Sequence, residues 1–120
     1  MICSYGDVAV VPFPFVERDV VKVRPAIVLS SEKFNRDNDS TVLAMITTAS
    51  RSAWPADIAI TDGPAAGLLH PSIVRWKVFN LPNALIARIV GRLTSADLEA
   101  VTRAGREVLF AYAHSPPSKT

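Results

Sequence analysis

The fold is indicated first by one stretch of the chain, DVAVVPF at residues 7–13. Its middle is apolar on both faces of an extended chain, as in a strand that a barrel encloses on both sides. Pro12 and Pro14 lack the N–H group that a sheet ladder needs, so the strand should end there or lie at an edge. The stretch therefore predicts a strand within a small, enclosed β structure.

Further strands are expected along the rest of the chain, at residues 26–30, 41–47, 57–61, 72–79 and 85–90. Asn and Asp side chains crowd the segment between residues 31 and 40, which predicts a break between two strands. Strands outnumber every other element in this pattern. A small sheet of five or six strands that is strongly bent usually closes partly into a barrel.

The single strong helix is expected at the C-terminal end, from a cap at Thr94 or Ser95 to about Ala113. Asp97 stands where an acidic side chain favours the N-terminal end of the helix dipole. An apolar stripe with the helical period consists of Leu98, Val101, Val108, Leu109 and Tyr112. Strands followed by one helix predict an α+β domain over residues 1–114, with a flexible tail at residues 115–120.

Size and composition agree with one small domain. The chain has 120 residues and a mass of 13.0 kDa, and 49% of its residues are hydrophobic. The net charge of +2 and the pI near 9.0 indicate only a mild preference for polyanions. No apolar run approaches the ~20 residues that span a bilayer, and no signal peptide is visible. The single cysteine, Cys3, fits a reducing compartment, so we expect a cytoplasmic protein.

Several classes of chemistry lack their usual motifs. The chain has no CxxC, no HExxH and no histidine cluster, so we expect neither a catalytic metal nor a cofactor. There is no glycine-rich phosphate loop. His70 and His114 lie far apart in the sequence, which argues against a histidine-pair ribonuclease. We interpret His70 as a simple loop residue.

The remaining candidates are polar residues at strand ends. Arg24 precedes Pro25 where a loop becomes the second strand, and Thr47 ends the third strand. If these strands pair, a guanidinium and a hydroxyl would meet across the sheet and could hold a phosphate. The alternative is structural: Arg24 pairs with an acid such as Asp19, and Thr47 satisfies a strand end.

Five blocks in order make the chain similar to a known family. They are GDVAVVPFPF followed by RPAIVLS (residues 6–15 and 24–30), ITT (46–48), AGLL (66–69), PSIVR (71–75) and IVGRL (89–93). Together they resemble the MazF/PemK toxins of type II toxin–antitoxin systems. The resemblance covers nearly the whole chain, from Gly6 to about Val108.

The resemblance implies an SH3-like, partly open barrel of five to seven strands with a C-terminal helix, acting as a homodimer. It implies metal-independent cleavage of single-stranded RNA at short motifs, by attack of the 2′-OH on the adjacent phosphate. Arg24 matches the family's active-site arginine and Thr47 its active-site threonine. Asp19 matches an acidic position of several members and is a further catalytic candidate, although the loop before Arg24 lacks the glycine that many members have.

The candidate RNA-binding residues are Phe15, Lys22, Thr48, Ser50, Arg75 and Lys77. The three cations among them could follow the RNA backbone, and Phe15 or Trp76 could stack a base. We favour a core position for Trp76, because it alternates with charged residues. Arg88 and Arg92 are interpreted as dimer or surface charges.

Two alternatives to a ribonuclease remain open at the level of the sequence. A toxin of similar fold can act by binding a protein target such as DNA gyrase, and such a protein does not need the Arg24 and Thr47 pair. A barrel of this kind can also serve as an adaptor for RNA or protein. For a family toxin the expected partners are single-stranded RNA, a second copy of the chain and a cognate antitoxin whose disordered tail occupies the RNA groove.

Overall fold

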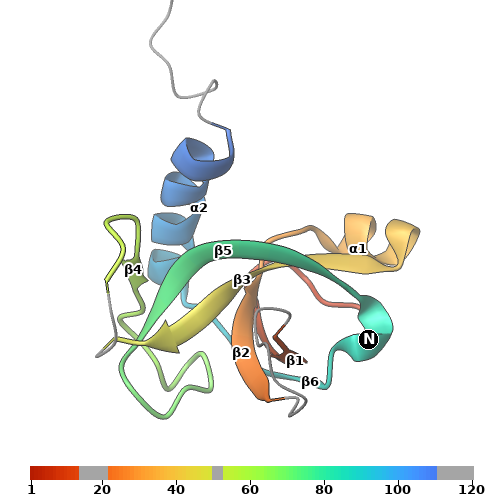
Figure 1. The fold of residues 1–120 in the computed structure, drawn as a ribbon, viewed down its shortest axis with the longest axis horizontal. Coiled ribbons are helices and arrows are strands. Elements are labelled where there is room, and N and C mark those ends of the chain that lie inside the picture. Colours follow the sequence, from red (N-terminus) through yellow and green to blue (C-terminus); the bar gives the residue numbers. More distant parts are fainter. Residues whose placement is uncertain (14–21, 50–52, 111–120) are drawn as a thin grey trace, which may run out of the picture.

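The computed structural model of the protein describes residues 1–13, 22–49 and 53–110. These residues form one curled antiparallel sheet and a C-terminal helix (Figure 1). The strands are β1 (Asp7–Pro12), β2 (Val23–Val28), β3 (Ser40–Thr48), β4 (Ile58–Ala59), β5 (Ser72–Pro82) and β6 (Arg88–Arg92). They lie side by side in the order β4-β5-β3-β2-β1-β6. The predicted α+β fold, a small, partly open barrel of five to seven strands with a C-terminal helix, is confirmed.

Several strand boundaries differ from those predicted, and β4 covers only Ile58–Ala59 of the expected residues 57–61. β2 begins at Val23, before Pro25, because its first residues pair with β1: Arg24 lies opposite Val11 and Pro25 opposite Val10. β5 continues to Pro82, along the whole of β3. A short 3₁₀ helix, η1 (Asn83–Leu85), takes up the region where we expected the last strand to begin.

The break predicted between the second and third strands holds a helix, α1 (Glu32–Asn38), which was missed. Ser31 caps this helix by accepting a hydrogen bond from the backbone N–H of Phe34 at 3.1 Å. Asp39 ends it in the left-handed conformation, at φ 49°. The Asn and Asp side chains predict a turn, but Asn35 is fully buried and donates to the carbonyl of Cys3 at 2.8 Å. Tertiary contact therefore supports a helix that its composition disfavours.

Apolar side chains are buried on both faces of the sheet, as the first strand predicted. On β1, Val8 belongs to one core cluster, whereas Ala9 and Val11 belong to the other, and all three are fully buried. The cluster that contains Val8 also contains Val101 of the C-terminal helix. Enclosure of β1 on both faces explains why its sequence is a continuous apolar run.

The C-terminal helix, α2 (Ser95–Leu109), is capped by Thr94, whose hydroxyl accepts from the backbone N–H of Asp97 at 3.2 Å. Val101 is buried, but Val108 and Leu109 are 41% and 43% exposed. The predicted stripe is therefore wrong for its C-terminal half, since that part of α2 extends past the sheet (Figure 1). Tyr112 and the predicted tail lie outside the described residues.

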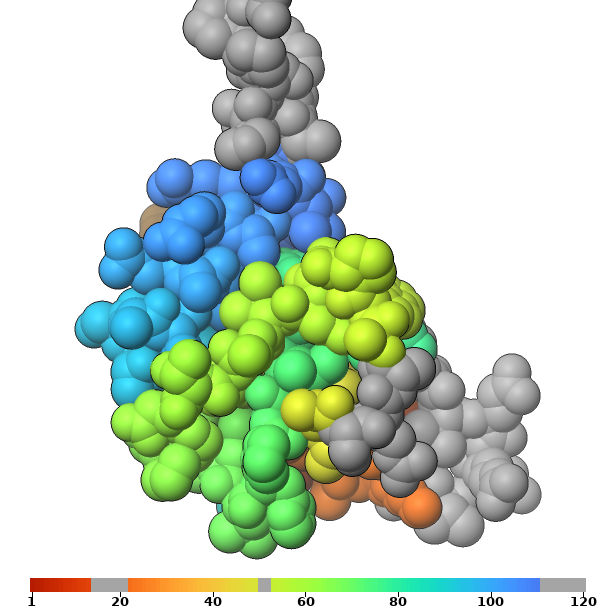
Figure 2. Space-filling view, turned by 90° about the vertical axis from the view of Figure 1, so that its left-hand side faces the viewer, coloured from red at the N-terminus to blue at the C-terminus, as the bar shows by residue number. Residues whose placement is uncertain are grey.

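The loop between β4 and β5 joins the two edges of the curled sheet. The backbone N–H of Arg92 in β6 donates to the carbonyl of Ala65 at 3.3 Å. A Cβ at Gly91 would lie 2.5 Å from the carbonyl carbon of Ala66, and one at Gly67 would lie 2.3 Å from the carbonyl oxygen of Val90. Both glycines are therefore required where the loop meets β6. Figure 2 shows this segment, in lime to green, running beside the blue α2.

Candidate functional site

A groove of about 620 Å³ opens where the ends of β2, β3 and β5 meet the loop between β4 and β5. Its lining comes from Val10, Phe13, Arg24, Pro25, Met45, Ile46, Thr47, Thr48, Gly67, Leu68, Leu69, His70, Ser72, Lys77, Arg88 and Val90. Residues far apart in the sequence thus share one surface. The loop that the two glycines hold against β6 supplies one wall.

Arg24 and Thr47 both line this groove, as predicted. The register of β2 and β3 explains why, because Ala26 pairs with Met45. Arg24 and Thr47 each lie two residues beyond this last pair, so a continued register would place them opposite each other on one face of the sheet. Directly opposite residues have Cβ atoms about 5 Å apart, which lets a guanidinium and a hydroxyl reach one phosphate.

The charge of the groove is strongly one-sided. Arg24, Lys77 and Arg88 all line it, and its described lining contains no aspartate or glutamate. Arg24 is exposed and forms no salt bridge with the residues that the structure describes. Such a surface attracts polyanions although the whole chain carries only +2.

Two of the His, Lys and Arg residues in the groove lining were not predicted as site residues. Arg88 was interpreted as a dimer or surface charge, and it lines the groove. His70 lies in a loop, as we interpreted it, but this loop is the groove wall. Neither lies in a motif that connects it to Arg24; only the curl of the sheet brings β6 and the loop to the same place. Arg92, in contrast, pairs with Asp7 at the other end of β1.

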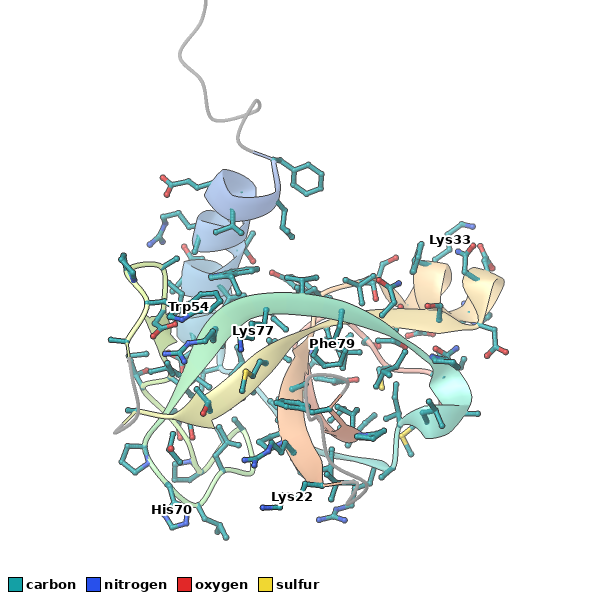
Figure 3. The ribbon with its side chains drawn as sticks, viewed as in Figure 1. Lys22, Lys33, Trp54, His70, Lys77 and Phe79 are labelled. Atoms are coloured by element: carbon teal, nitrogen blue, oxygen red, sulfur yellow. The ribbon has the colours of Figure 1, made fainter. Side chains whose placement is uncertain are left out.

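The predicted RNA-binding residues are only partly brought together. Thr48 and Lys77 line the groove, whereas Lys22 is exposed but does not line it. Figure 3 shows Lys77 under the arch of β5 and Lys22 near the lower end of β2. Two further RNA-binding candidates, Phe15 and Ser50, and the catalytic candidate Asp19 lie outside the described residues.

Arg75 needs a correction. We predicted it on the RNA track beside Lys77, but its side chain is only 7% exposed and does not line the groove. Its Nε donates to Asp57 Oδ1 at 3.1 Å, and a terminal nitrogen donates to Oδ2 at 2.8 Å. Two residues of β5 break the strict alternation, because a bulge interrupts the pairing with β3 after Ala44. Arg75 and Trp76 are consequently both buried, and the core position of Trp76 is confirmed.

The contact with Arg75 favours the ionised form of the Asp57 carboxyl. The hydrogen bonds from the Arg75 guanidinium lower the pKa of the Asp57 carboxyl and outweigh the opposing effect of burial. The same contact raises the pKa of Arg75. Asp57 also accepts from the backbone N–H of Trp54 at 2.8 Å. The pair therefore fixes the turn at residues 54–57 against β5.

A second buried carboxylate fixes the start of the loop that forms the groove wall. Asp97 of α2 accepts hydrogen bonds from the backbone N–H and the hydroxyl of Thr61 and from the backbone N–H of Asp62, at 2.7 to 3.1 Å. Burial alone would raise the pKa of Asp97, but these hydrogen bonds dominate and lower it. Neither carboxylate reaches the groove lining, so we assign both to support of the site.

The described part of the chain contains neither a cluster of metal ligands nor a helix suited to span a membrane. There, no three His, Cys, Asp or Glu side chains are grouped so that they could hold a metal ion. No helix within the described ranges combines the length and the apolar character needed to cross a membrane.

Comparison with solved structures identifies the fold. MazF from Deinococcus radiodurans is 17% identical, with a TM-score of 0.71 over 92% of this chain and 98% of that one. A mycobacterial endoribonuclease in complex with its cognate antitoxin is 19% identical, with a TM-score of 0.70 over 91% and 94% of the two chains. The Mycobacterium tuberculosis toxin MazF-mt6 is 20% identical, with a TM-score of 0.69 over 87% and 96%.

Comparison by sequence gives the family. No curated protein matches significantly. The family model described as the PemK-like, MazF-like toxin of type II toxin–antitoxin systems matches residues 4–109, which include every described strand and α2. The chain therefore belongs to the PemK-like, MazF-like toxins of type II toxin–antitoxin systems.

Proposed function

We propose that the groove is the active site of an endoribonuclease that cleaves single-stranded RNA at short sequence motifs. The observation that carries this proposal is the composition of the groove: three cationic side chains and no described carboxylate, with Arg24 and Thr47 both in its lining. Proteins that grip a nucleic-acid strand need clustered cations far more than a high net charge. Solved proteins of the same fold are named endoribonucleases, which supports the assignment.

The chemistry is a transesterification within the RNA. The ribose 2′-oxygen attacks the adjacent phosphorus and loses its proton, the bond from phosphorus to the 5′-oxygen breaks, and that oxygen gains a proton. The products are a 2′,3′-cyclic phosphate and a 5′-hydroxyl. Arg24 stabilises the charge that builds on the phosphorane oxygens, and Thr47 donates a hydrogen bond that fixes the phosphate. A guanidinium stays protonated, so Arg24 acts as an electrostatic group and not as the base.

We propose that this cleavage needs no metal ion. Mg²⁺ is usually held in such sites through one or two carboxylates, and none lies in the described lining of the groove. The guanidinium takes over the role of charge neutralisation at the phosphate.

The test is incubation of the purified protein with a long RNA in the presence of EDTA, followed by mapping of the cut ends. We expect cleavage at a small set of related sites, with cyclic-phosphate and 5′-hydroxyl ends. A requirement for added Mg²⁺, or 5′-phosphate ends, would contradict the mechanism. Absence of cleavage together with tight binding to a protein such as DNA gyrase would favour the non-catalytic toxin.

Two partners follow from the same proposal. One small domain presents few cations, so we propose that two copies form a homodimer with a shared RNA surface. Light scattering should then give about twice the chain mass of 13.0 kDa. A cognate antitoxin with an acidic, disordered tail should compete with RNA for the groove, and a purified antitoxin that leaves cleavage unchanged would contradict this part of the proposal.

A further inference from the structure

Trp54 lies beside the groove, directly past Lys77. The Lys77 ammonium is 5.6 Å from the centroid of the indole ring, and Lys77 itself lines the groove. Figure 3 shows Trp54 and Lys77 next to each other along β5. Trp54 nevertheless keeps 40% of its surface exposed, whereas Trp76 is 9% exposed. A large, partly exposed aromatic side chain thus lies next to one of the cations that line the groove.

The position of this ring is fixed by several contacts. The backbone N–H of Trp54 donates to Asp57 Oδ2 at 2.8 Å, and the backbone N–H of Asp57 donates back to the carbonyl of Trp54 at 3.0 Å. The guanidinium of Arg75, which Asp57 holds through two hydrogen bonds, lies 5.2 Å from the ring centroid. A buried ion pair therefore supports an exposed ring, an arrangement that core packing does not require.

We infer that Trp54 is a stacking site for one nucleobase of the bound RNA, outside the Arg24 and Thr47 centre. This inference rests on the proposed function, because it assumes that the strand follows the groove past Lys77. Exposed aromatic side chains next to cations bind single strands by stacking a base on the ring while the cation meets the neighbouring phosphate. The Lys77 ammonium, which lies beside the ring and lines the groove, favours a nucleic acid over an apolar protein segment.

Arg75 and Asp57 are positioning residues in this account. They do not contact the RNA. They hold the indole at a fixed place, so that its side chain loses little conformational entropy when a base stacks on it. This role is consistent with the burial of Arg75, which pairs with Asp57 beside Trp54 and does not line the groove.

Intrinsic fluorescence provides a direct test, because the chain contains only two tryptophans. The probe is a short, fully 2′-O-methylated oligoribonucleotide, which has no 2′-hydroxyl to attack and so cannot be cleaved by the proposed route. Stacking should quench Trp54, and the Trp54→Phe variant, which keeps only the buried Trp76, should show little quenching. Quenching that persists in Trp54→Phe would overturn the inference.

Affinity should change in parallel. One base stacked on an aromatic ring corresponds to a roughly 5- to 150-fold change in Kd, so Trp54→Ala should bind that much more weakly, with Trp54→Phe in between. Phe110→Ala is the matched control, since Phe110 is an aromatic side chain that is 64% exposed at the end of α2 and does not line the groove. Thermal melts of all three variants report on folding.

A thermodynamic cycle identifies the contact itself. One abasic nucleotide is placed at each position of the oligonucleotide in turn. At one position the abasic change should weaken binding to the wild type but not further weaken binding to Trp54→Ala. Additive losses at every position would overturn the inference, as would an unchanged Kd in folded Trp54→Ala. A loss of antitoxin binding alone would assign the ring to a protein partner and also overturn it.

Failure of this inference is distinguishable from failure of the proposed function. If the protein cleaves RNA in EDTA but Trp54→Ala has wild-type affinity and no altered quenching, only the stacking site is wrong. If the protein cleaves no RNA, the binding measurements with the uncleavable probe still report whether a base stacks on Trp54.

Discussion

Replacing Asp97 with alanine should loosen the joint between α2 and the loop that forms the groove wall. Asp97 is 3% exposed and accepts from three donors, namely the backbone N–H and hydroxyl of Thr61 and the backbone N–H of Asp62. The loop that begins at Thr61 ends at the groove residues Leu69 and His70. Loss of the Asp97 carboxylate therefore frees the start of this loop at Thr61, while the end of the loop at His70 contributes to the groove.

The magnitude follows from the number and kind of these hydrogen bonds. A hydrogen bond to a charged group contributes roughly 1.5–3 kcal/mol net. Thr61 and Asp62 are exposed, so their freed donors regain water, and about 1 kcal/mol for each of the three is the better estimate. Loss of about 3 kcal/mol corresponds to a decrease in Tm of roughly 10–15 °C for a chain of this size. Asp97→Asn keeps one acceptor oxygen and should lose about half as much.

The assay is urea unfolding of the wild type and both variants across a range of pH. The pKa of Asp97 is lowered in the folded state, so its contribution is fully present above the unfolded value near 4 and is lost as pH falls through the folded pKa. The difference between wild type and Asp97→Ala should therefore shrink on acidification below about pH 4. Glu99→Ala, on the exposed side of α2, is the matched control. A difference under about 1 kcal/mol at neutral pH, or one that grows on acidification, would refute the reasoning.

Three further changes test other parts of the structure. Thr47→Ala should raise the activation free energy of single-turnover RNA cleavage by about 2–4 kcal/mol if the Thr47 hydroxyl holds the phosphate. Thr47→Ser should keep part of the rate. Equal rates in both variants and the wild type would remove Thr47 from the site. Gly91→Ala would place a Cβ 2.5 Å from Ala66, so we expect poor folding or a Tm lowered by many degrees, and a normal melt would show that the loop moves aside. Asn35→Ala removes a buried side chain that donates to the carbonyl of Cys3, and should cost roughly 1–3 kcal/mol in urea unfolding; an unchanged midpoint would contradict the buried network.

The sequence predicts the sheet well because period and turn chemistry are local properties. The apolar run of β1 predicts enclosure on both faces, and both of its faces are buried. The capped start of α2 at Thr94 is also confirmed. What local patterns do not contain is contact across the fold. The helix α1 was missed because its support, the bond from Asn35 to Cys3, joins residues 32 positions apart.

The candidate site is predicted unevenly for the same reason. Arg24 and Thr47 stand at strand ends, so pairing of two neighbouring strands was enough to bring them together. Arg75 was misplaced because alternation along β5 assumes an unbroken strand, and the bulge near Ala44 changes which residues are buried. Asp57, its partner, lies on a separate turn that no pattern connects with β5. Arg88 reaches the groove only through the curl of the sheet.

Cleavage of RNA by the wild type and Arg24→Ala tests the central claim most directly. The measurement is single-turnover cleavage of one oligoribonucleotide in EDTA, with product ends identified and thermal melts recorded. Arg103→Ala, which removes a guanidinium that is 71% exposed on α2, serves as the control for charge. We predict cyclic-phosphate and 5′-hydroxyl ends for the wild type and Arg103→Ala, and a rate reduced by at least about a hundredfold for folded Arg24→Ala. Near wild-type cleavage by folded Arg24→Ala would contradict the account.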